Sequence, residues 1–251
     1  MKKILLLSTG GTIATEKTEN GLAPKLTSRE LLESVPQVKS FCQVDAVQLF
    51  NIDSSNMQPE NWVAMAQAIR DRYADYDGFL ITHGTDTMVY TAAALSYLIQ
   101  DSPKPIVLTG SQKSISYRDT DARMNLSDAF LYCCSQGAWG VHIVFGGKVI
   151  QGTRARKIRT KSFDAFDSIN YPPVAAIRDG RLYYYIRESP APGGPHFCLG
   201  LCPDVFLLKL APGMDAGIFP ALKERYRAMV IESFGVGGVP AYGAFSQGIQ
   251  D

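Results

Sequence analysis

The stretch STGGTIA, residues 8–14, combines hydroxyl side chains and glycines in a way that could support nucleophilic chemistry. Gly10 and Gly11 permit close backbone approach, and their N–H groups could face an anion or a developing oxyanion. Thr9 and Thr12 add hydroxyls. Alone, the stretch is equally typical of a turn after a strand, and it lacks the lysine of a nucleotide-binding P-loop.

A second stretch, ITHGTDTM at residues 81–88, places Asp86 directly beside Thr85. The pattern that follows predicts a helix over residues 88–99, so Asp86 is also a candidate helix cap. We interpret His83 as a structural histidine rather than a ligand or a base. Both stretches therefore offer a hydroxyl, and only the second offers a carboxylate.

A threonine hydroxyl is a weak nucleophile at neutral pH and needs a positioned base, commonly a lysine. The sequence offers several basic residues in GTRARKIRTK, residues 152–161. Most of them are also compatible with a solvated strand face, so the residue types alone do not identify the base.

Apolar runs alternate with amphipathic segments through the first half of the chain. The runs predict strands at residues 2–7, 44–52, 78–82, 105–109 and 140–145, and an amphipathic stretch predicts a helix at 59–73. This alternation indicates a mainly parallel α/β sheet covered by helices. Ligands bind beyond the carboxyl ends of such strands, and both hydroxyl-bearing stretches lie there.

The pattern changes after residue 145. Residues 146–158, GGKVIQGTRARKI, predict a β-hairpin, and DGRLYYYIRE predicts a further strand. A stretch rich in proline and glycine, residues 189–203, predicts a linker. We therefore expect a domain at 1–188, a linker at 189–203 and a short β-α-β segment at 204–251, which is small for a domain with its own core.

Charge and hydropathy exclude several classes of partner. The chain has 25 basic and 24 acidic residues and a net charge of +1, so no overall field attracts nucleic acid or an acidic membrane. No apolar stretch approaches the roughly 20 residues of a membrane span. The apolar run at 4–7 is too short for a signal peptide. We expect a cytoplasmic protein that binds a small molecule.

The cysteines do not predict a disulfide framework or a metal site. They are odd in number: Cys42, Cys133, Cys134, Cys198 and Cys202. His196 with Cys198 and Cys202 lacks the paired short spacings of a structural zinc site. We expect no bound metal.

Four motifs occur in a characteristic order along the chain: TGGTIA, NIDSSNM, THGTDTM and GTRARK. In this order the sequence resembles the bacterial-type L-asparaginases, and within them the cytoplasmic type I branch, from residue 3 to about residue 240. The two threonine motifs together make the resemblance highly specific.

The resemblance implies roles for four residues. Thr12 matches the threonine that attacks the side-chain amide of L-asparagine and forms an acyl-enzyme, from which water releases L-aspartate. Thr85 and Lys157 match a pair that relays a proton, and Asp86 matches the residue that orients the lysine and binds the substrate's α-amino group. The family needs no metal or cofactor, so none is expected here.

The resemblance also implies a substrate-binding set. Ser54 and Ser55, in NIDSSNM, match positions that hold the substrate α-carboxylate, although a serine-rich turn after a strand is the simpler interpretation. The backbone N–H groups near Gly11 and Thr85 match the oxyanion site. Many relatives have a tyrosine near the nucleophile, but the matching segment TENGLAPKLT has Leu22 there instead. Either another residue orients Thr12, or its activation differs.

Family members continue beyond GVGGVP, residues 235–240, through most of a smaller C-terminal α/β domain. The resemblance thus implies a larger N-terminal domain with a flavodoxin-like, mainly parallel sheet and a β-hairpin, then a linker and an incomplete second domain. We expect a truncated family member whose relatives form homodimers or homotetramers with shared sites.

Two other functions remain open from the sequence. One is a glutaminase-asparaginase or the asparaginase-like subunit of a tRNA amidotransferase, because one methylene in the substrate changes binding by only about 1–3 kcal/mol. The other is a truncated, non-catalytic form that binds an amino acid.

Overall fold

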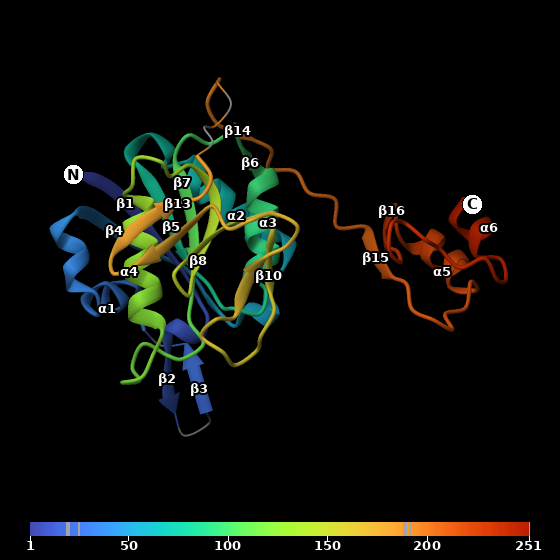
Figure 1. Cartoon of the computed structure of the whole chain (residues 1–251), viewed down its shortest axis with the longest axis horizontal. Coiled ribbons are helices and arrows are strands. Elements are labelled where there is room, and N and C mark those ends of the chain that lie inside the picture. Colours follow the sequence, from blue (N-terminus) through green and yellow to red (C-terminus); the bar gives the residue numbers. More distant parts are fainter. Residues whose placement is uncertain (19–20, 25, 188–189, 191, 251) are drawn as a thin grey trace. The chain divides into compact units, whose positions relative to one another are not determined.

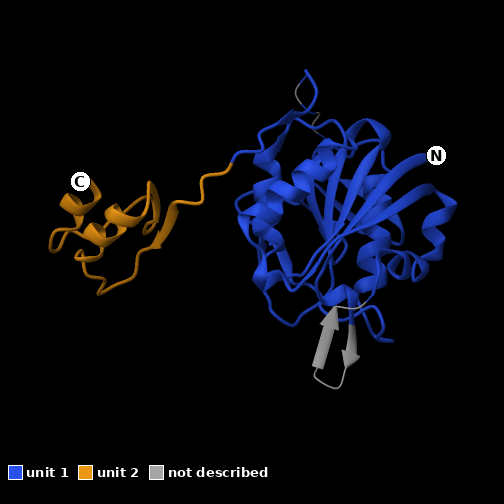
Figure 2. Cartoon of the chain, turned by 180° about the vertical axis from the view of Figure 1, so that it is seen from behind, with its two compact units in different colours: residues 1–200 blue, residues 201–251 orange. Residues whose placement is uncertain are grey.

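The computed structural model describes residues 1–18, 21–24, 26–187, 190 and 192–250, with the backbone alone at 16–18 and 21–24. The chain forms two compact units, Met1–Gly200 and Leu201–Asp251, shown in different colours in Figure 2. The first unit contains every residue proposed above for chemistry or substrate binding.

The first unit is built on an eight-stranded sheet in the order β13-β12-β9-β8-β7-β5-β1-β4 (Figure 1). Its strands are β1 Lys2–Gly10, β4 Cys42–Ile52, β5 Gly78–Thr82, β7 Pro105–Thr109, β8 Gly140–Phe145, β9 Lys148–Gln151, β12 Ala175–Arg178 and β13 Arg181–Tyr184. Neighbouring strands are parallel among β4, β1, β5, β7 and β8, and β9, β12 and β13 pair antiparallel to their neighbours. The predicted mainly parallel α/β sheet is therefore confirmed.

Strand β1 is apolar at successive positions because both of its faces are covered. Ile4 and Leu6 belong to one buried cluster, while Leu5 and Leu7 belong to the other. The first cluster includes side chains of α1 (Ser28–Glu33) and α4 (Ala122–Cys133), and the second includes side chains of α2 (Pro59–Arg70) and α3 (Met88–Leu98). Helices thus cover the sheet on both faces, which leaves the strand ends for binding.

The ends of the second helix follow local sequence signals. Helix α2 begins at Pro59, and Gln58 and Asn61 form a reciprocal capping box around its first turn. It ends at Arg70 rather than at residue 73 as predicted, because Tyr73–Asp75 form a separate 3-10 turn.

The predicted β-hairpin within residues 146–158 is wrong in its pairing. Strand β9 pairs with β8 across a two-residue turn, and β10 (Ala155–Lys157) pairs with β11 (Phe166–Ser168). Gly146 and Gly147 have φ values of 57° and 70°, and two consecutive positive φ values are what a tight hairpin turn of this kind requires. The glycine pair therefore joins β9 to the strand before it, and β10 leaves the main sheet.

The remaining elements are small. The antiparallel pair β2 (Thr15–Thr18) and β3 (Gly21–Pro24) follows the 3-10 helix η1 (Thr12–Ala14), and two further short 3-10 helices are η2 (Pro36–Ser40) and η3 (Ser54–Asn56). Strand β6 (Ile99–Gln100) pairs with β14 (His196–Phe197). No helix in the described part of the chain is both long and apolar enough to cross a bilayer.

The second unit contains the parallel strands β15 (Val205–Lys209) and β16 (Ala228–Glu232) with helices α5 (Ile218–Arg225) and α6 (Phe245–Gln250). Its buried core consists of Leu208, Leu210, Phe219 and Phe245. Alternate residues of the strands, among them Leu207 and Val230, remain exposed.

The packing around Tyr132 generates a stability prediction. Tyr132 is fully buried in α4, and its hydroxyl has no hydrogen-bond partner among the described residues. Its neighbour Tyr184 has a hydroxyl 2.5 Å from Ser135 Oγ. Removing an unpaired buried hydroxyl relieves a desolvation cost, so Tyr132→Phe should raise the free energy of unfolding by about 1 kcal/mol.

Tyr184→Phe is the matched control, and it should lower the free energy of unfolding by about 1 kcal/mol because it removes a made hydrogen bond. Urea unfolding of both variants measures the difference. A loss of stability in Tyr132→Phe equal to that in Tyr184→Phe would contradict the assignment of an unpaired hydroxyl.

Candidate active site

The carboxyl ends of β1, β4 and β5 meet through direct backbone contact. A Cβ atom on Gly11 would lie 2.4 Å from the amide nitrogen of Gly84, and a Cβ atom on Gly10 would lie 2.5 Å from the carbonyl oxygen of Ile52. Gly10 and Gly11 also have φ values of 100° and 79°. The Gly11 N–H donates to the Ile52 carbonyl at 3.1 Å. Both positions therefore require glycine, for space and for backbone conformation.

Ser54 joins the same contact from the turn after β4. A Cβ atom on Gly84 would lie 2.5 Å from Ser54 Oγ, and the Thr87 hydroxyl donates to the Ser54 carbonyl at 2.7 Å. The Ser54 side chain is buried. The first, second and third motifs are thus held together at one place.

Lys157 contacts both polar residues of the second motif. Its Nζ donates to Thr85 Oγ1 at 2.8 Å and to Asp86 Oδ1 at 2.6 Å. Thr85 is buried, the Lys157 side chain is 14% exposed and the Asp86 side chain is 67% exposed. The lysine head is therefore largely shielded from water, while the carboxylate remains open to a ligand.

Asp86 does not cap helix α3, because the residue before the helix is Thr87 and its side chain makes no capping bond. The alternative interpretation of Asp86 as a helix cap is therefore wrong. The carboxylate instead pairs with Lys157 across more than seventy residues of sequence.

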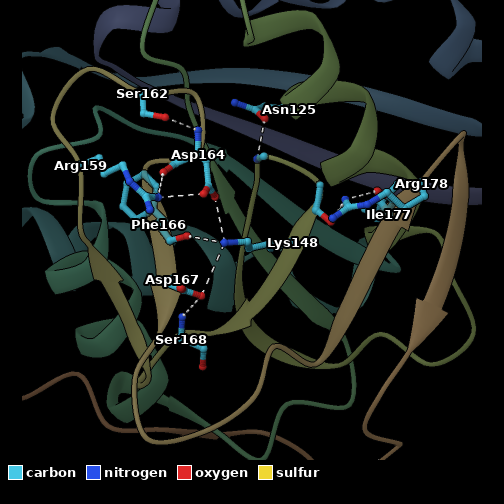
Figure 3. A network of polar contacts seen from close by, with 12 residues as sticks. Asn125, Lys148, Arg159, Ser162, Asp164, Phe166, Asp167, Ser168, Ile177 and Arg178 are labelled. Carbon is cyan, nitrogen blue, oxygen red and sulfur yellow. Dashed lines mark hydrogen bonds and ion pairs between the residues drawn. The ribbon is translucent and has the colours of Figure 1, made fainter.

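A network of ion pairs fixes the short β10–β11 pair that carries Lys157 (Figure 3). Lys148 Nζ lies 2.9 Å from Asp164 Oδ1 and 3.6 Å from Asp167 Oδ1, and Arg159 Nη1 lies 2.8 Å from Asp164 Oδ2. Phe166 pairs with Lys157 in register. Its ring is buried and lies 4.8 Å from that of Phe145 in β8, so the pair is anchored by apolar packing as well.

Thr12 opens the 3-10 helix η1 directly after the Gly11 contact. It is half-buried, and its carbonyl accepts a hydrogen bond from the Thr15 hydroxyl at 2.8 Å. No partner for the Thr12 hydroxyl is present among the described residues. The Leu22 side chain, which the sequence places where relatives have a tyrosine, lies outside the described part.

Ser55 makes hydrogen bonds within its own turn. Its N–H and its hydroxyl both donate to Asp53 Oδ1, at 2.8 and 2.7 Å, and these bonds hold the pKa of Asp53 below its usual range. Ser55 is exposed and Ser54 is buried. The serine-turn interpretation is therefore correct for Ser55, whose hydroxyl would have to change partner to bind a ligand.

His83 is fully buried and hydrogen-bonded at both ring nitrogens. Nδ1 donates to the Gly84 carbonyl at 2.7 Å, and Nε2 accepts from the Thr91 hydroxyl at 2.9 Å, which in turn accepts from Trp62 Nε1 at 2.9 Å. Burial lowers the pKa of His83 to about 4, so the ring is neutral at pH 7. His83 is thus structural, as predicted, and its chain of bonds ends at the contact glycine.

A model of the asparaginase family, described as "Asparaginase, N-terminal", matches residues 3–190. The chain belongs to the asparaginase family. An L-asparaginase of Thermococcus kodakarensis is 36% identical over 242 residues, which are 96% of this chain and 74% of that protein. A subunit of the glutamyl-tRNA(Gln) amidotransferase of Pyrococcus furiosus is 36% identical over 254 residues, 95% of this chain and 57% of that protein.

Solved structures give the same result. The thermostable L-asparaginase from Thermococcus kodakarensis has a TM-score of 0.92 to this chain at 35% sequence identity. The match covers 98% of this chain and 76% of that protein's chain. A probable cytoplasmic L-asparaginase from Campylobacter jejuni has a TM-score of 0.86 at 27% sequence identity. The match covers 100% of this chain and 79% of that protein's chain. The asparaginase fold thus extends over almost the whole chain.

In this asparaginase-family chain the predicted site residues form two groups, one joined by hydrogen bonds and one by close packing against the Gly84 backbone. Thr85, Asp86 and Lys157 are joined by hydrogen bonds, and Gly11 and Ser54 each contact Gly84. Thr12 follows this contact in the chain.

The sequence reasoning missed Gln112 and the buried Asp121. The Thr85 hydroxyl donates to Gln112 Oε1 at 3.4 Å, and the Gln112 N–H donates to Asp121 Oδ2 at 2.9 Å. A signal was available, because Gln112 comes just after β7, which pairs with β5 in parallel. Both threonine motifs lie just beyond strand ends, where ligands bind in such sheets, and this loop occupies the same kind of position.

The histidine–cysteine group considered for zinc forms only a pair. His196 Nδ1 lies 3.3 Å from Cys198 Sγ, and the described residues contain no group of three or more side chains suited to hold a metal ion.

Burial of His83 predicts a loss of stability in acid. The unfolded state binds a proton below pH 6.5, whereas native His83 binds one only near pH 4, so stability falls as pH decreases through this window. The shift corresponds to about 3 kcal/mol. Urea unfolding between pH 7 and pH 4 should therefore show a shallower pH dependence for His83→Gln than for the unchanged chain.

His196→Gln, at an exposed histidine, is the matched control for the loss of one histidine. Buried His142, with its pKa lowered to about 4, adds to the acid loss, and Asp128, with its pKa raised to about 6, opposes it. Both are present in all three proteins, so they do not affect the differences. An equal slope in His83→Gln and the unchanged chain would contradict a buried neutral His83.

Proposed function

We propose that the chain hydrolyses L-asparagine to L-aspartate and ammonia. The observation that carries the proposal is the contact of Lys157 Nζ with both Thr85 Oγ1 and Asp86 Oδ1, beside the junction of Gly11 and Gly84. This arrangement supplies a hydroxyl, an amine and a carboxylate next to a threonine that follows a glycine turn. The L-asparaginase relatives support the choice of substrate.

In the proposed reaction the Thr12 hydroxyl oxygen attacks the side-chain amide carbon of the substrate. The hydroxyl proton reaches the amide nitrogen, which leaves as ammonia, and an ester between Thr12 and the aspartyl group remains. Thr85 and Lys157 then take a proton from a water molecule, whose oxygen attacks the ester carbon. The bond from this carbon to Thr12 Oγ1 breaks, the proton passes to Oγ1, and L-aspartate is released. Lys157 must first give up one of its three protons, because an ammonium group cannot accept one.

The oxyanion of each step would form at backbone N–H groups near Gly11 and Thr85. The N–H of Gly11 itself donates to the Ile52 carbonyl, so the donor at the first motif would be an amide next to it. One such donor typically lowers the activation free energy by about 2.7–4 kcal/mol. The close contact between Gly11 and Gly84 supports this assignment, since it fixes the local backbone without side-chain motion. The site would thus be preorganised before substrate binds.

The exposed Asp86 carboxylate would bind the substrate's α-amino group, and Ser54 and Ser55 would bind its α-carboxylate. The 67% exposure of the Asp86 side chain supports its part of the proposal. Ser55 would exchange its bond to Asp53 for one to the ligand. The reaction would need neither metal nor cofactor.

Ammonia release from L-asparagine tests the proposal. Thr12→Ala removes the nucleophile, and Thr85→Ala and Lys157→Met each remove a positioned acid or base. Each variant should lower kcat/KM by at least about a hundredfold. Thr153→Ala, an exposed threonine, is the matched control and should retain activity. Activity unchanged in Thr12→Ala and Thr85→Ala would contradict the proposed roles.

The same assay with L-glutamine distinguishes the other functions. Faster turnover of glutamine would favour a glutaminase-asparaginase or an amidotransferase subunit, a candidate supported by the Pyrococcus furiosus relative. Measurable asparagine binding without turnover would favour a non-catalytic binding form.

We further propose a cytoplasmic homodimer or homotetramer. The Campylobacter jejuni structure, whose name calls it cytoplasmic, supports the location, and the resemblance to oligomeric relatives supports the assembly. Light scattering of the purified chain should give two or four times the monomer mass of 27.5 kDa. A folded, active monomer would contradict the assembly.

A further inference from the structure

Gln112 connects two parts of the candidate site that are distant in sequence. Its Oε1 accepts a hydrogen bond from Thr85 Oγ1 at 3.4 Å. Its Nε2 donates to the carbonyls of Ser162 at 3.0 Å and Arg159 at 3.5 Å. The side chain therefore bridges the end of β5 and the loop between β10 and β11.

These partners determine the orientation of the Gln112 amide. Nε2 faces two backbone carbonyls, which only accept hydrogen bonds, so the donor end of the amide must lie there. Oε1 must then face the Thr85 hydroxyl. The flipped amide would place an oxygen against two carbonyl oxygens, and the assignment is thus chemically fixed.

The loop that holds Gln112 is itself rigid. The N–H of Gln112 donates to both oxygens of Asp121, at 2.9 and 3.1 Å, and Lys113 N–H donates to the same carboxylate. Asp121 is buried and also accepts from Asn125 Nδ2 at 3.1 Å. Gln112 therefore extends from a fixed backbone rather than from a free loop.

The loop between β10 and β11, which the Gln112 amide contacts, is also held by polar contacts. Arg159 pairs with Asp164, which also pairs with Lys148 (Figure 3), and the loop leads directly from β10 to β11. Lys157, at the end of β10, bonds to Thr85. Thr85, Gln112, the loop and Lys157 thus form a closed ring of contacts.

The ring has a consequence for the Thr85 proton. Lys157 Nζ donates to Thr85 Oγ1, so the hydroxyl proton must point to a different acceptor. Among the described residues that acceptor is Gln112 Oε1. This contact holds Thr85 Oγ1 beside Lys157 Nζ, so that the hydroxyl proton can turn toward the amine once Lys157 is neutral.

We propose that Gln112 is a positioning residue that orients the Thr85 hydroxyl and fixes the loop next to Lys157. The inference rests on the proposed amide hydrolysis, in which Thr85 and Lys157 move a proton. Gln112 acts through Thr85 and touches no reacting atom, so its loss should slow the chemical step and spare substrate binding.

Kinetics of Gln112→Leu with L-asparagine test the proposal. We expect kcat to fall about tenfold, the upper end of what one neutral hydrogen bond contributes, while KM stays within about twofold. Gln67→Leu, an exposed glutamine on α2, is the matched control and should change neither constant. Circular dichroism and thermal unfolding check that all variants fold.

Gln112→Glu provides a readout that a merely structural role would not affect. A carboxylate could still accept from Thr85, although it loses the donor that faces the Ser162 and Arg159 carbonyls. Its charge next to Thr85 would favour the ammonium form of Lys157. Because Lys157 must lose a proton to act, the acidic limb of the pH–activity profile should move to higher pH. An unshifted profile would overturn the proposal.

A crystal structure of Gln112→Leu separates failure of this inference from failure of the proposed function. The Thr85 side chain should change rotamer or become disordered, whether or not the chain has activity. An unmoved Thr85 together with unchanged kcat would overturn the positioning role. An unchanged chain without turnover, but with Thr85 displaced in the variant, would reject the hydrolase function alone.

Discussion

The site depends on the backbone contact between Gly11 and Gly84. Two parallel strands, β1 and β5, end side by side, and the chain after each turns toward the other until no side chain fits between them. Ser54 fills the remaining space from the adjacent turn. The positions of Thr12, Thr85 and the nearby N–H groups all follow from this junction, because each lies next to a glycine that cannot move without displacing its neighbour.

Lys157 reaches this junction by a different physical route. It lies on the antiparallel pair β10–β11, which is separate from the main sheet. This pair is held by the packing of Phe166 in the core, by the ion pairs around Lys148 and by the Gln112 amide. Most of these ion-pair side chains are half-exposed, so each contributes little alone and the network acts collectively. The sheet thus provides the fixed half of the site, and polar contacts hold the lysine against it.

The sequence predicted the parts of this arrangement that local patterns determine. Buried strands such as β5 and β7 are apolar at every position but the last, and the glycine and threonine motifs at strand ends indicated where ligands would bind. Lys157 comes from the fourth motif, and its amine contacts Thr85 and Asp86 of the third. The pairing of β9 was mispredicted because a Gly-Gly turn competes with a later turn, and one segment does not show which partner prevails. Gln112 follows a strand end, as the threonine motifs do, but it belongs to none of the four motifs, and its three partners are placed only by the fold.

The ring of contacts through Thr85, Gln112 and Lys157 joins segments that differ in how much of the protein must open to expose them. Strands β1 and β5 are buried on both faces, whereas the loop after β10 is held by a few side chains at the surface. Local unfolding of such a loop requires far less free energy than unfolding of a central strand. Opening of this loop would therefore release the Gln112 amide at less cost than a break in the glycine junction, and β10 with Lys157 would lose that support while the central sheet stays folded.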